Sequence, residues 1–117
     1  MSSISSIRTE YSKASLDVNS VHHNPVEQFS VWFNEALAAK LPEPTAMHLA
    51  TVNERGNPAG RMVLLKGVEE SKFVFYTNYQ SQKGKHLDHH PACALTFFWP
   101  ELERQVRIEG IVSRIDD

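Results

Sequence analysis

From residue 46 onward the sequence is a succession of short apolar segments separated by turn residues, and this pattern constrains the fold most. A dense cluster of turn formers occupies residues 53–58, and residues 67–71 form a second connection. Short strands joined mostly by tight turns predict an antiparallel sheet or barrel, because parallel strands need long crossover connections. We expect the strands at residues 46–52, 60–66, 72–77, 92–99 and 104–115, with one short helix at 81–89 ended by Pro91.

A longer helix is predicted ahead of the strands. Asn24 can cap it, Pro25 suits the first helical position, and Glu27 stands where a capping-box partner belongs. The helix is expected to end before the prolines at 42 and 44, because proline lacks the backbone N–H that a helix needs. Apolar residues spaced three and four apart predict its buried face: Val26, Phe29, Phe33, Ala36 and Leu37.

Size and composition point to one ordinary globular domain. The chain has 117 residues, a formal net charge of −2, 41% hydrophobic residues and 22% charged residues. No apolar run approaches the ~20 residues of a membrane span, and the slightly acidic balance argues against nucleic-acid binding. The start of the chain lacks the pattern of a secretory signal. With a single cysteine, Cys93, these features predict a cytoplasmic protein without disulfides.

The first 23 residues differ from the rest. They are polar and rich in serine, with no sustained period, so we expect an arm that is mobile unless it docks. The domain proper is predicted at residues 24–117. The chain stops directly after a long strand, which leaves the predicted barrel with an unprotected edge and suggests a fragment, incomplete at the C-terminus.

Histidine and cysteine carry little predicted chemistry. His86, His89 and His90 would share one helical face, but no fourth ligand is apparent, so a solvated helix end is favoured over a metal site. Cys93 lies in an apolar strand without a neighbouring base and is interpreted as a buried, inert thiol. Nucleophile elbows, glycine-rich dinucleotide motifs and P-loops are absent. We therefore assign no catalytic residue and no metal site.

The most informative segment is the predicted strand at residues 61–66. Arg61 and Lys66 bracket it, and hydroxyl and basic groups follow within twenty residues, a set suited to a phosphorylated ligand. The alternative is a pair of ordinary charges at the strand ends. Residues five apart on a regular strand face opposite sides, so a shared ligand requires a bulge, a backbone contact or a ligand that spans the strand.

At these residues the sequence resembles the pyridoxine/pyridoxamine 5′-phosphate oxidases. The resemblance implies a mainly β fold with a few helices, an FMN-binding split β-barrel that forms homodimers with FMN at the subunit interface. The matching motifs run in order along nearly the whole chain: Ile7-Arg8-x-Glu10-Tyr11, Asn24-Pro25 leading through Trp32, Pro44-Thr45-Ala46-Met47, Ala50-Thr51-Val52, Arg61-x-Val63-Leu64-Leu65-Lys66, Phe75-Tyr76-Thr77-Asn78, Ser81-x-Lys83 and Leu102-Glu103-Arg104-Gln105-Val106.

The resemblance also implies roles for individual residues. The arm would become a substrate lid through Arg8 and Tyr11, and Lys66 would touch both the substrate and the flavin. Gln82 stands where the family usually has arginine, which predicts weaker affinity for the FMN phosphate. The implied FMN-binding set is Arg61, Met62, Val63, Leu64, Leu65, Lys66, Tyr76, Thr77, Gln82, Lys83 and Gln105.

The implied reaction is oxidation of pyridoxamine or pyridoxine 5′-phosphate by dioxygen, which yields pyridoxal 5′-phosphate and hydrogen peroxide in vitamin B6 metabolism. The resemblance covers only the N-terminal half of such an enzyme, so activity of this chain alone is not implied. Two alternatives therefore stay open. One is a non-catalytic module that binds flavin or a B6 phosphate, and the other is a related flavin oxidase for another small aromatic substrate.

Overall fold

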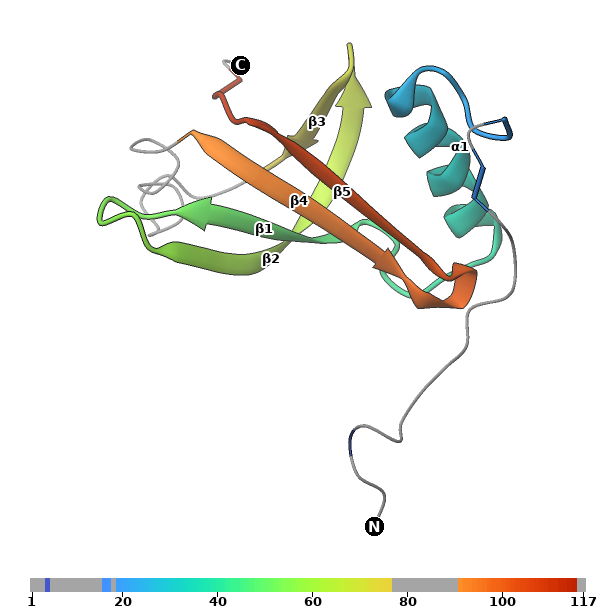
Figure 1. Ribbon diagram of the computed structural model, residues 1–117, viewed down its shortest axis with the longest axis horizontal. Coiled ribbons are helices and arrows are strands. Elements are labelled where there is room, and N and C mark those ends of the chain that lie inside the picture. The colour runs from blue at the N-terminus through green and yellow to red at the C-terminus, as the bar shows by residue number, and fades with distance from the viewer. Residues whose placement is uncertain (1–3, 5–15, 18, 77–90, 116–117) are drawn as a thin grey trace.

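A computed structural model describes residues 4, 16–17, 19–76 and 91–115. Within them one helix, α1 (Pro25–Ala38), precedes five strands and a short 3-10 turn, η2 (Pro100–Leu102) (Figure 1). The mainly β prediction is confirmed. No helix among the described residues is long and apolar enough to cross a membrane. The strands are β1 (Ala46–Val52), β2 (Pro58–Glu69), β3 (Lys72–Phe75), β4 (Ala92–Trp99) and β5 (Arg104–Ile111).

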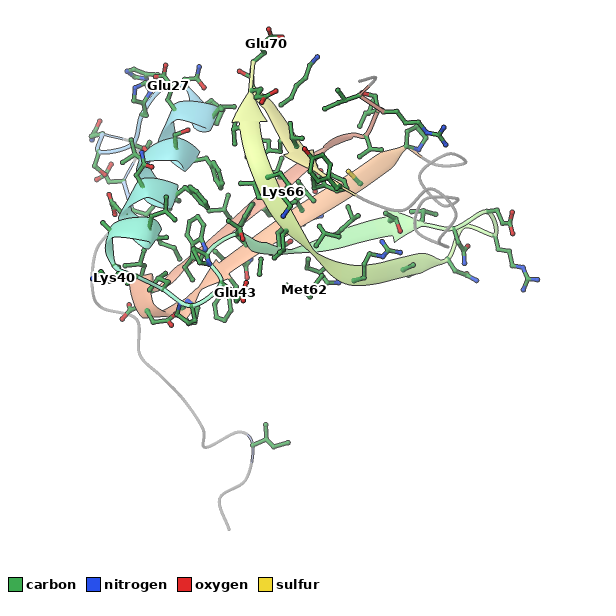
Figure 2. The ribbon with its side chains drawn as sticks, turned by 180° about the vertical axis from the view of Figure 1, so that it is seen from behind. Glu27, Lys40, Glu43, Met62, Lys66 and Glu70 are labelled. Carbon is green, nitrogen blue, oxygen red and sulfur yellow. The ribbon has the colours of Figure 1, made fainter. Side chains whose placement is uncertain are left out.

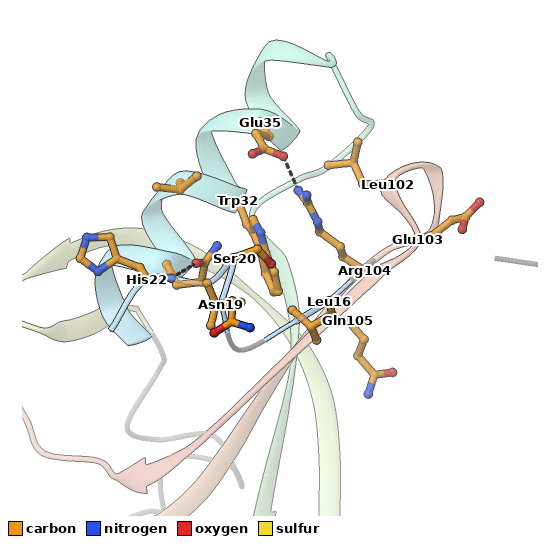
Figure 3. A pocket seen from close by; sticks show the side chains of 13 residues that line it. Leu16, Asn19, Ser20, His22, Trp32, Glu35, Leu102, Glu103, Arg104 and Gln105 are labelled. Carbon is orange, nitrogen blue, oxygen red and sulfur yellow. Dashed lines mark hydrogen bonds and ion pairs between the residues drawn. The ribbon is translucent and has the colours of Figure 1, made fainter. Parts of the chain in front are cut away.

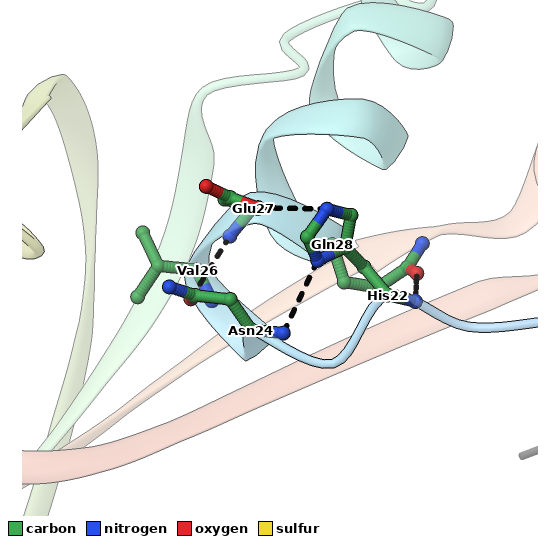
Figure 4. Close-up of polar contacts among 5 residues, drawn as sticks. All are labelled: His22, Asn24, Val26, Glu27 and Gln28. Carbon is green, nitrogen blue, oxygen red and sulfur yellow. Dashed lines mark hydrogen bonds and ion pairs between the residues drawn. The ribbon is translucent and has the colours of Figure 1, made fainter.

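Helix α1 begins as predicted at its cap but not in its capping box. The Asn24 side chain accepts hydrogen bonds from the backbone N–H groups of Val26, at 2.9 Å, and Glu27. The Glu27 carboxylate does not reach back to the cap residue; it lies 2.7 Å from Nε2 of His22 instead (Figure 4). The Asn24 N–H donates to Nδ1 of His22, so a histidine outside the helix takes the place of the second half of the box.

The helix ends at Ala38, before the prolines that were predicted to stop it. Lys40 adopts a left-handed conformation with φ 55°, and its N–H donates to the carbonyl of Leu37. The N–H of Leu41 donates to the carbonyl of Ala36. These two bonds form a Schellman motif, which satisfies the last carbonyls without glycine or proline.

All strand pairs are antiparallel, and the sheet order is β3-β2-β1-β4-β5. The sheet curls strongly in Figure 1. The predicted connection at 67–71 is wrong: β2 continues to Glu69, which pairs with Lys72. Only Glu70 and Ser71 turn the chain, both with positive φ, as in the two-residue turns that suit hairpins. Strand β5 ends at Ile111 rather than at 115.

One face of the sheet, the inner face, packs against α1 around Phe29. The Phe29 ring lies 5.0 Å from the ring of Phe73 and 5.1 Å from that of Phe97, measured between centroids. The predicted helix face is confirmed at Phe29 and Ala36, whereas Leu37 is 47% exposed. The buried core consists of Phe29, Ala36, Met47, Leu49, Val63, Leu65, Leu95, Phe97 and Trp99.

The opposite side of the sheet, the outer face, is covered by no described element. Two rows of paired residues cross it from β2 to β5. Gly60, Ala50, Ala94 and Glu109 are successive partners in one row, and Met62, His48, Thr96 and Arg107 are successive partners in the next. Large apolar side chains are exposed there, including Met62, Leu64 and Phe98. Exposed apolar groups gathered on one face indicate a binding surface.

Candidate functional site

The predicted cofactor strand is β2, and its six motif residues divide between the two faces of the sheet. Val63 and Leu65 are 6% and 5% exposed, so the core uses their side chains. Met62 and Leu64 are 61% and 43% exposed on the outer face, and Lys66 is exposed beyond them (Figure 2). A ligand lying along this part of β2 can therefore contact the outer side chains, whereas Val63 and Leu65 can offer it only their backbone.

A β-bulge lies at Lys66. Leu65 pairs with Phe75 and Gly67 pairs with Val74, so Lys66 has no partner residue on β3. A bulge leaves backbone groups outside the ladder and redirects a side chain, and bulges often stand beside active sites. The sequence argument named a bulge as one of three ways to share a ligand along this strand, beside a backbone contact and a ligand that spans the strand. The structure contains a bulge at the residue predicted to touch both cofactor and substrate, although Lys66 and Arg61 remain on opposite faces.

Arg61 lies on the inner face at the other end of the motif. Its Nη1 donates to the hydroxyl of Thr51 at 2.9 Å and to the carbonyl of Leu49 at 3.2 Å. Thr51 is 3% exposed, and burial lowers the pKa of the Arg61 guanidinium. Both bonds use one nitrogen of the guanidinium and fix the side chain on the inner face. Arg61 and Lys66 face opposite sides, as their spacing predicted.

The remaining predicted residues divide into described and undescribed ones. Tyr76 follows β3 and is 75% exposed. Gln105 is exposed on β5, where it pairs with Phe98. Three strand spacings of about 4.8 Å, or roughly 14 Å, separate β5 from β2, so Gln105 and Lys66 do not meet within one chain. The predictions for Arg8, Tyr11, Thr77, Gln82, Lys83 and the helix at 81–89 fall outside the described residues.

A hollow that the sequence analysis missed lies between residues 16 and 19–22, α1 and the start of β5 (Figure 3). It is a groove of about 630 Å³ lined by Trp32, Glu35 and Arg104, among others. The Arg104 guanidinium carbon lies 4.8 Å from the centroid of the Trp32 ring, and Nη1 lies 2.5 Å from a carboxylate oxygen of Glu35. Because these groups satisfy one another, the groove offers a ligand less unpaired charge than β2 does.

Neither histidine nor cysteine adds a reactive centre in the described part of the chain. No three His, Cys, Asp or Glu side chains converge there to hold a metal, and His86, His89 and His90 lie outside it. Cys93 is half-buried, and burial raises the pKa of its thiol. A raised pKa favours the protonated, unreactive form, which supports the interpretation of Cys93 as an inert thiol.

Comparison with protein families assigns most of the chain. Residues 33–117 match the model of the family described as pyridoxamine 5′-phosphate oxidase. A curated relative from Burkholderia thailandensis, named pyridoxine/pyridoxamine 5′-phosphate oxidase, is 58% identical over 114 residues. The match covers 97% of this chain and 53% of the relative. The chain thus spans about half the length of the curated relatives it matches.

Solved structures support the fold. PhzG from Burkholderia lata, in complex with tetrahydrophenazine-1-carboxylic acid, has a TM-score of 0.76 and 25% identity, over 80% of this chain and 46% of that one. A pyridoxamine 5′-phosphate oxidase-related, FMN binding protein from Nostoc punctiforme has a TM-score of 0.59 and 23% identity, over 79% and 48% respectively. The expected split-barrel architecture is confirmed.

Proposed function

The chain belongs to the pyridoxamine 5′-phosphate oxidase family, and from that premise we propose that its protein oxidises pyridoxamine or pyridoxine 5′-phosphate with dioxygen. The products would be pyridoxal 5′-phosphate and hydrogen peroxide, as part of cytoplasmic vitamin B6 metabolism. The observation that carries the proposal is the bulge at Lys66, within the motif that matches the family. The relative from Burkholderia thailandensis bears the corresponding name.

The residues of β2 fit FMN as the cofactor. A flavin needs a flat apolar surface for its ring and polar groups at its edges, as small-molecule sites generally do. Met62 and Leu64 provide exposed apolar side chains on the outer face, whereas the inner face behind them is filled by the core. Lys66 supplies a cation at one end, and the bulge supplies backbone groups outside the ladder.

When bound, FMN would accept a hydride from the substrate and pass its electrons to dioxygen. The protein groups would then bind and orient. Lys66 would contact both the flavin and the substrate, and its positive charge would stabilise negative charge that develops on the flavin. The resemblance also assigns Arg61 to the cofactor. Its side chain is held on the inner face by Thr51 and the carbonyl of Leu49, so it would offer a flavin on the outer face its backbone. We assign no general base.

The roles of the remaining predicted site residues are proposed from the family resemblance alone. Tyr76, Thr77, Gln82 and Lys83 would complete the FMN site, and Arg8 and Tyr11 would cover the substrate. Two copies of the protein would form a dimer with FMN between them. The roughly 14 Å between β5 and β2 supports this arrangement, because Gln105 could reach the flavin of a partner copy more easily than that of its own chain.

A second candidate is a related flavin oxidase for another small aromatic substrate. The observation that favours it is the likeness to PhzG, whose structure contains tetrahydrophenazine-1-carboxylic acid. A third is a binding module without turnover, which the match to only half of each relative keeps open.

One experiment separates these candidates. The purified protein is titrated with FMN, followed by flavin fluorescence, and hydrogen peroxide is then measured with pyridoxamine 5′-phosphate and with a tetrahydrophenazine carboxylic acid. Uptake of FMN with peroxide only from the B6 phosphate supports the main proposal. Peroxide only from the phenazine substrate supports the second candidate, and FMN uptake without peroxide supports the module. A protein that takes up no FMN contradicts both oxidase candidates and a flavin-binding module, and leaves only a module that binds a B6 phosphate.

A further inference from the structure

His48 lies in the middle of the outer face, on the central strand β1. It pairs with Met62 on one side and with Thr96 on the other, so it shares the face that the cofactor strand presents. Its side chain is exposed. The sequence analysis did not single it out, because a lone histidine in an apolar strand carries no motif and its neighbours in space come from other strands.

The imidazole of His48 leans over β2 and rests above Gly60. A Cβ atom placed on Gly60 would lie only 2.3 Å from Nε2 and 2.6 Å from Cε1 of His48. Real Cβ contacts are essentially never this short, so the ring would have to shift if another residue stood at position 60. Glycine thus makes room for the histidine ring on the backbone of the cofactor strand, directly before Arg61.

His48 and Lys66 bracket an apolar stretch. On the outer face of the described strands β1 and β2, they are the two side chains that can donate hydrogen bonds; Met62 and Leu64 lie between them. Gly60, beneath the His48 ring, is six residues from Lys66, about 20 Å along an extended strand. An elongated ligand with an apolar middle and two polar ends matches this surface.

We propose that His48 is a cofactor-binding residue that donates a hydrogen bond to the phosphate of FMN. The proposal rests on the function proposed above, in which Lys66 stands at the end of the flavin that meets the substrate. The ribityl phosphate then extends toward the opposite end of the stretch, where His48 is the donor that β1 and β2 present, in addition to the phosphate contact that the resemblance implies near Gln82. A hydrogen bond from imidazole to phosphate is charge-assisted and about twice as strong as a neutral one.

The test compares two ligands that differ only in the phosphate. Wild type, His48→Ala and His48→Gln are each titrated with FMN and with riboflavin, and binding is followed by flavin fluorescence. We expect His48→Ala to weaken FMN binding about tenfold, the size of one charge-assisted hydrogen bond, and to leave riboflavin binding unchanged. His48→Gln keeps an N–H donor and should recover part of the loss. His23→Ala, an exposed histidine outside the sheet, is the matched control and should change neither affinity.

Two results overturn the inference while leaving the proposed function intact. Either His48→Ala binds FMN as tightly as wild type, or it loses FMN and riboflavin affinity equally. A wild-type protein that takes up no FMN contradicts the proposed function itself, and the inference falls with it. Far-ultraviolet circular dichroism of each variant checks that the fold is retained, and the phosphorus NMR shift of bound FMN reports directly on the contact, which should move in His48→Ala.

Discussion

Strand β2 carries similar apolar residues on both faces, yet those on one face are buried and those on the other are exposed. Val63 and Leu65 are almost completely buried against the core, whereas Met62 and Leu64, their immediate neighbours, are about half exposed or more. The same contrast runs across the sheet, where Phe97 is fully buried and Phe98 is 57% exposed. Packing explains the inner face. No described element covers the apolar side chains of the outer face, so an apolar strand does not by itself distinguish core from binding surface.

The largest expected effect compares Phe97→Ala with Phe98→Ala. The Phe97 ring lies 5.1 Å from that of Phe29 and 5.5 Å from that of Trp99, so its removal leaves a cavity. We expect Phe97→Ala to lower the free energy of unfolding by about 3–5 kcal/mol. Phe98→Ala should cost about 0.5 kcal/mol, as for an exposed residue. Urea denaturation measures both, and equal losses would show that the outer face is packed like the core.

The next effect concerns the hydrogen bond that holds Arg61. Thr51→Val keeps the volume but removes the buried hydroxyl that accepts from Nη1. The loss should be about 1–3 kcal/mol of unfolding free energy. Thr96→Val, on the outer face, is the matched control and should have almost no effect. If the two variants are equally stable in urea denaturation, Arg61 does not depend on Thr51 for its position.

Lys66→Ala should separate binding from stability. The side chain is exposed at a bulge, so its loss should leave unfolding within about 0.5 kcal/mol of wild type. Affinity for FMN and for pyridoxal 5′-phosphate should each fall about tenfold, equivalent to about 1.4 kcal/mol. Lys72→Ala, on β3 away from the bulge, should bind as wild type does. Fluorescence titration measures both affinities. If neither changes in Lys66→Ala, Lys66 does not contact both the flavin and the B6 ligand.

The smallest expected effect concerns the reactivity of Cys93, whose side chain lies on the inner face. Burial raises the pKa of the Cys93 thiol, so the folded chain holds less thiolate than the unfolded chain at about pH 8.5. Alkylation by iodoacetamide should therefore be slower in the folded protein than in urea. Because the folded state favours the protonated thiol, its contribution to stability is present below the unfolded pKa and is lost as pH rises through the folded one. Equal alkylation rates would contradict this.

Much of the fold follows from local sequence. The strand alternation placed all five strands, and Asn24 and Pro25 correctly located the start of the helix. The errors have physical causes. Glu70 and Ser71 make a tight turn in left-handed conformations that their residue types do not predict, so β2 appeared too short. The Schellman motif ended α1 through Lys40, a residue that rarely marks a helix end.

The candidate site was predictable in sequence but not in space. Motif resemblance predicted the cofactor strand at residues 61–66, which stays a prediction, and the expectation that Arg61 and Lys66 face opposite sides of that strand is confirmed. The bulge depends on pairing with β3, and the hydrogen bond from Arg61 to Thr51 depends on the neighbouring strand β1. Neither can be predicted from the local sequence. The contact of His48 with Gly60 is of the same kind, since the two residues lie twelve positions apart in the chain, on either side of a turn.

The central claim is that FMN binds along the outer face of β2, and methyl NMR of the protein with and without FMN tests it most directly. The account predicts that the methyl signals of Met62 and Leu64 shift on addition of FMN, while those of Met47 and Leu49, buried on the inner face, stay in place. FMN that binds and shifts only the inner-face methyls, or none of the outer-face ones, would contradict the account.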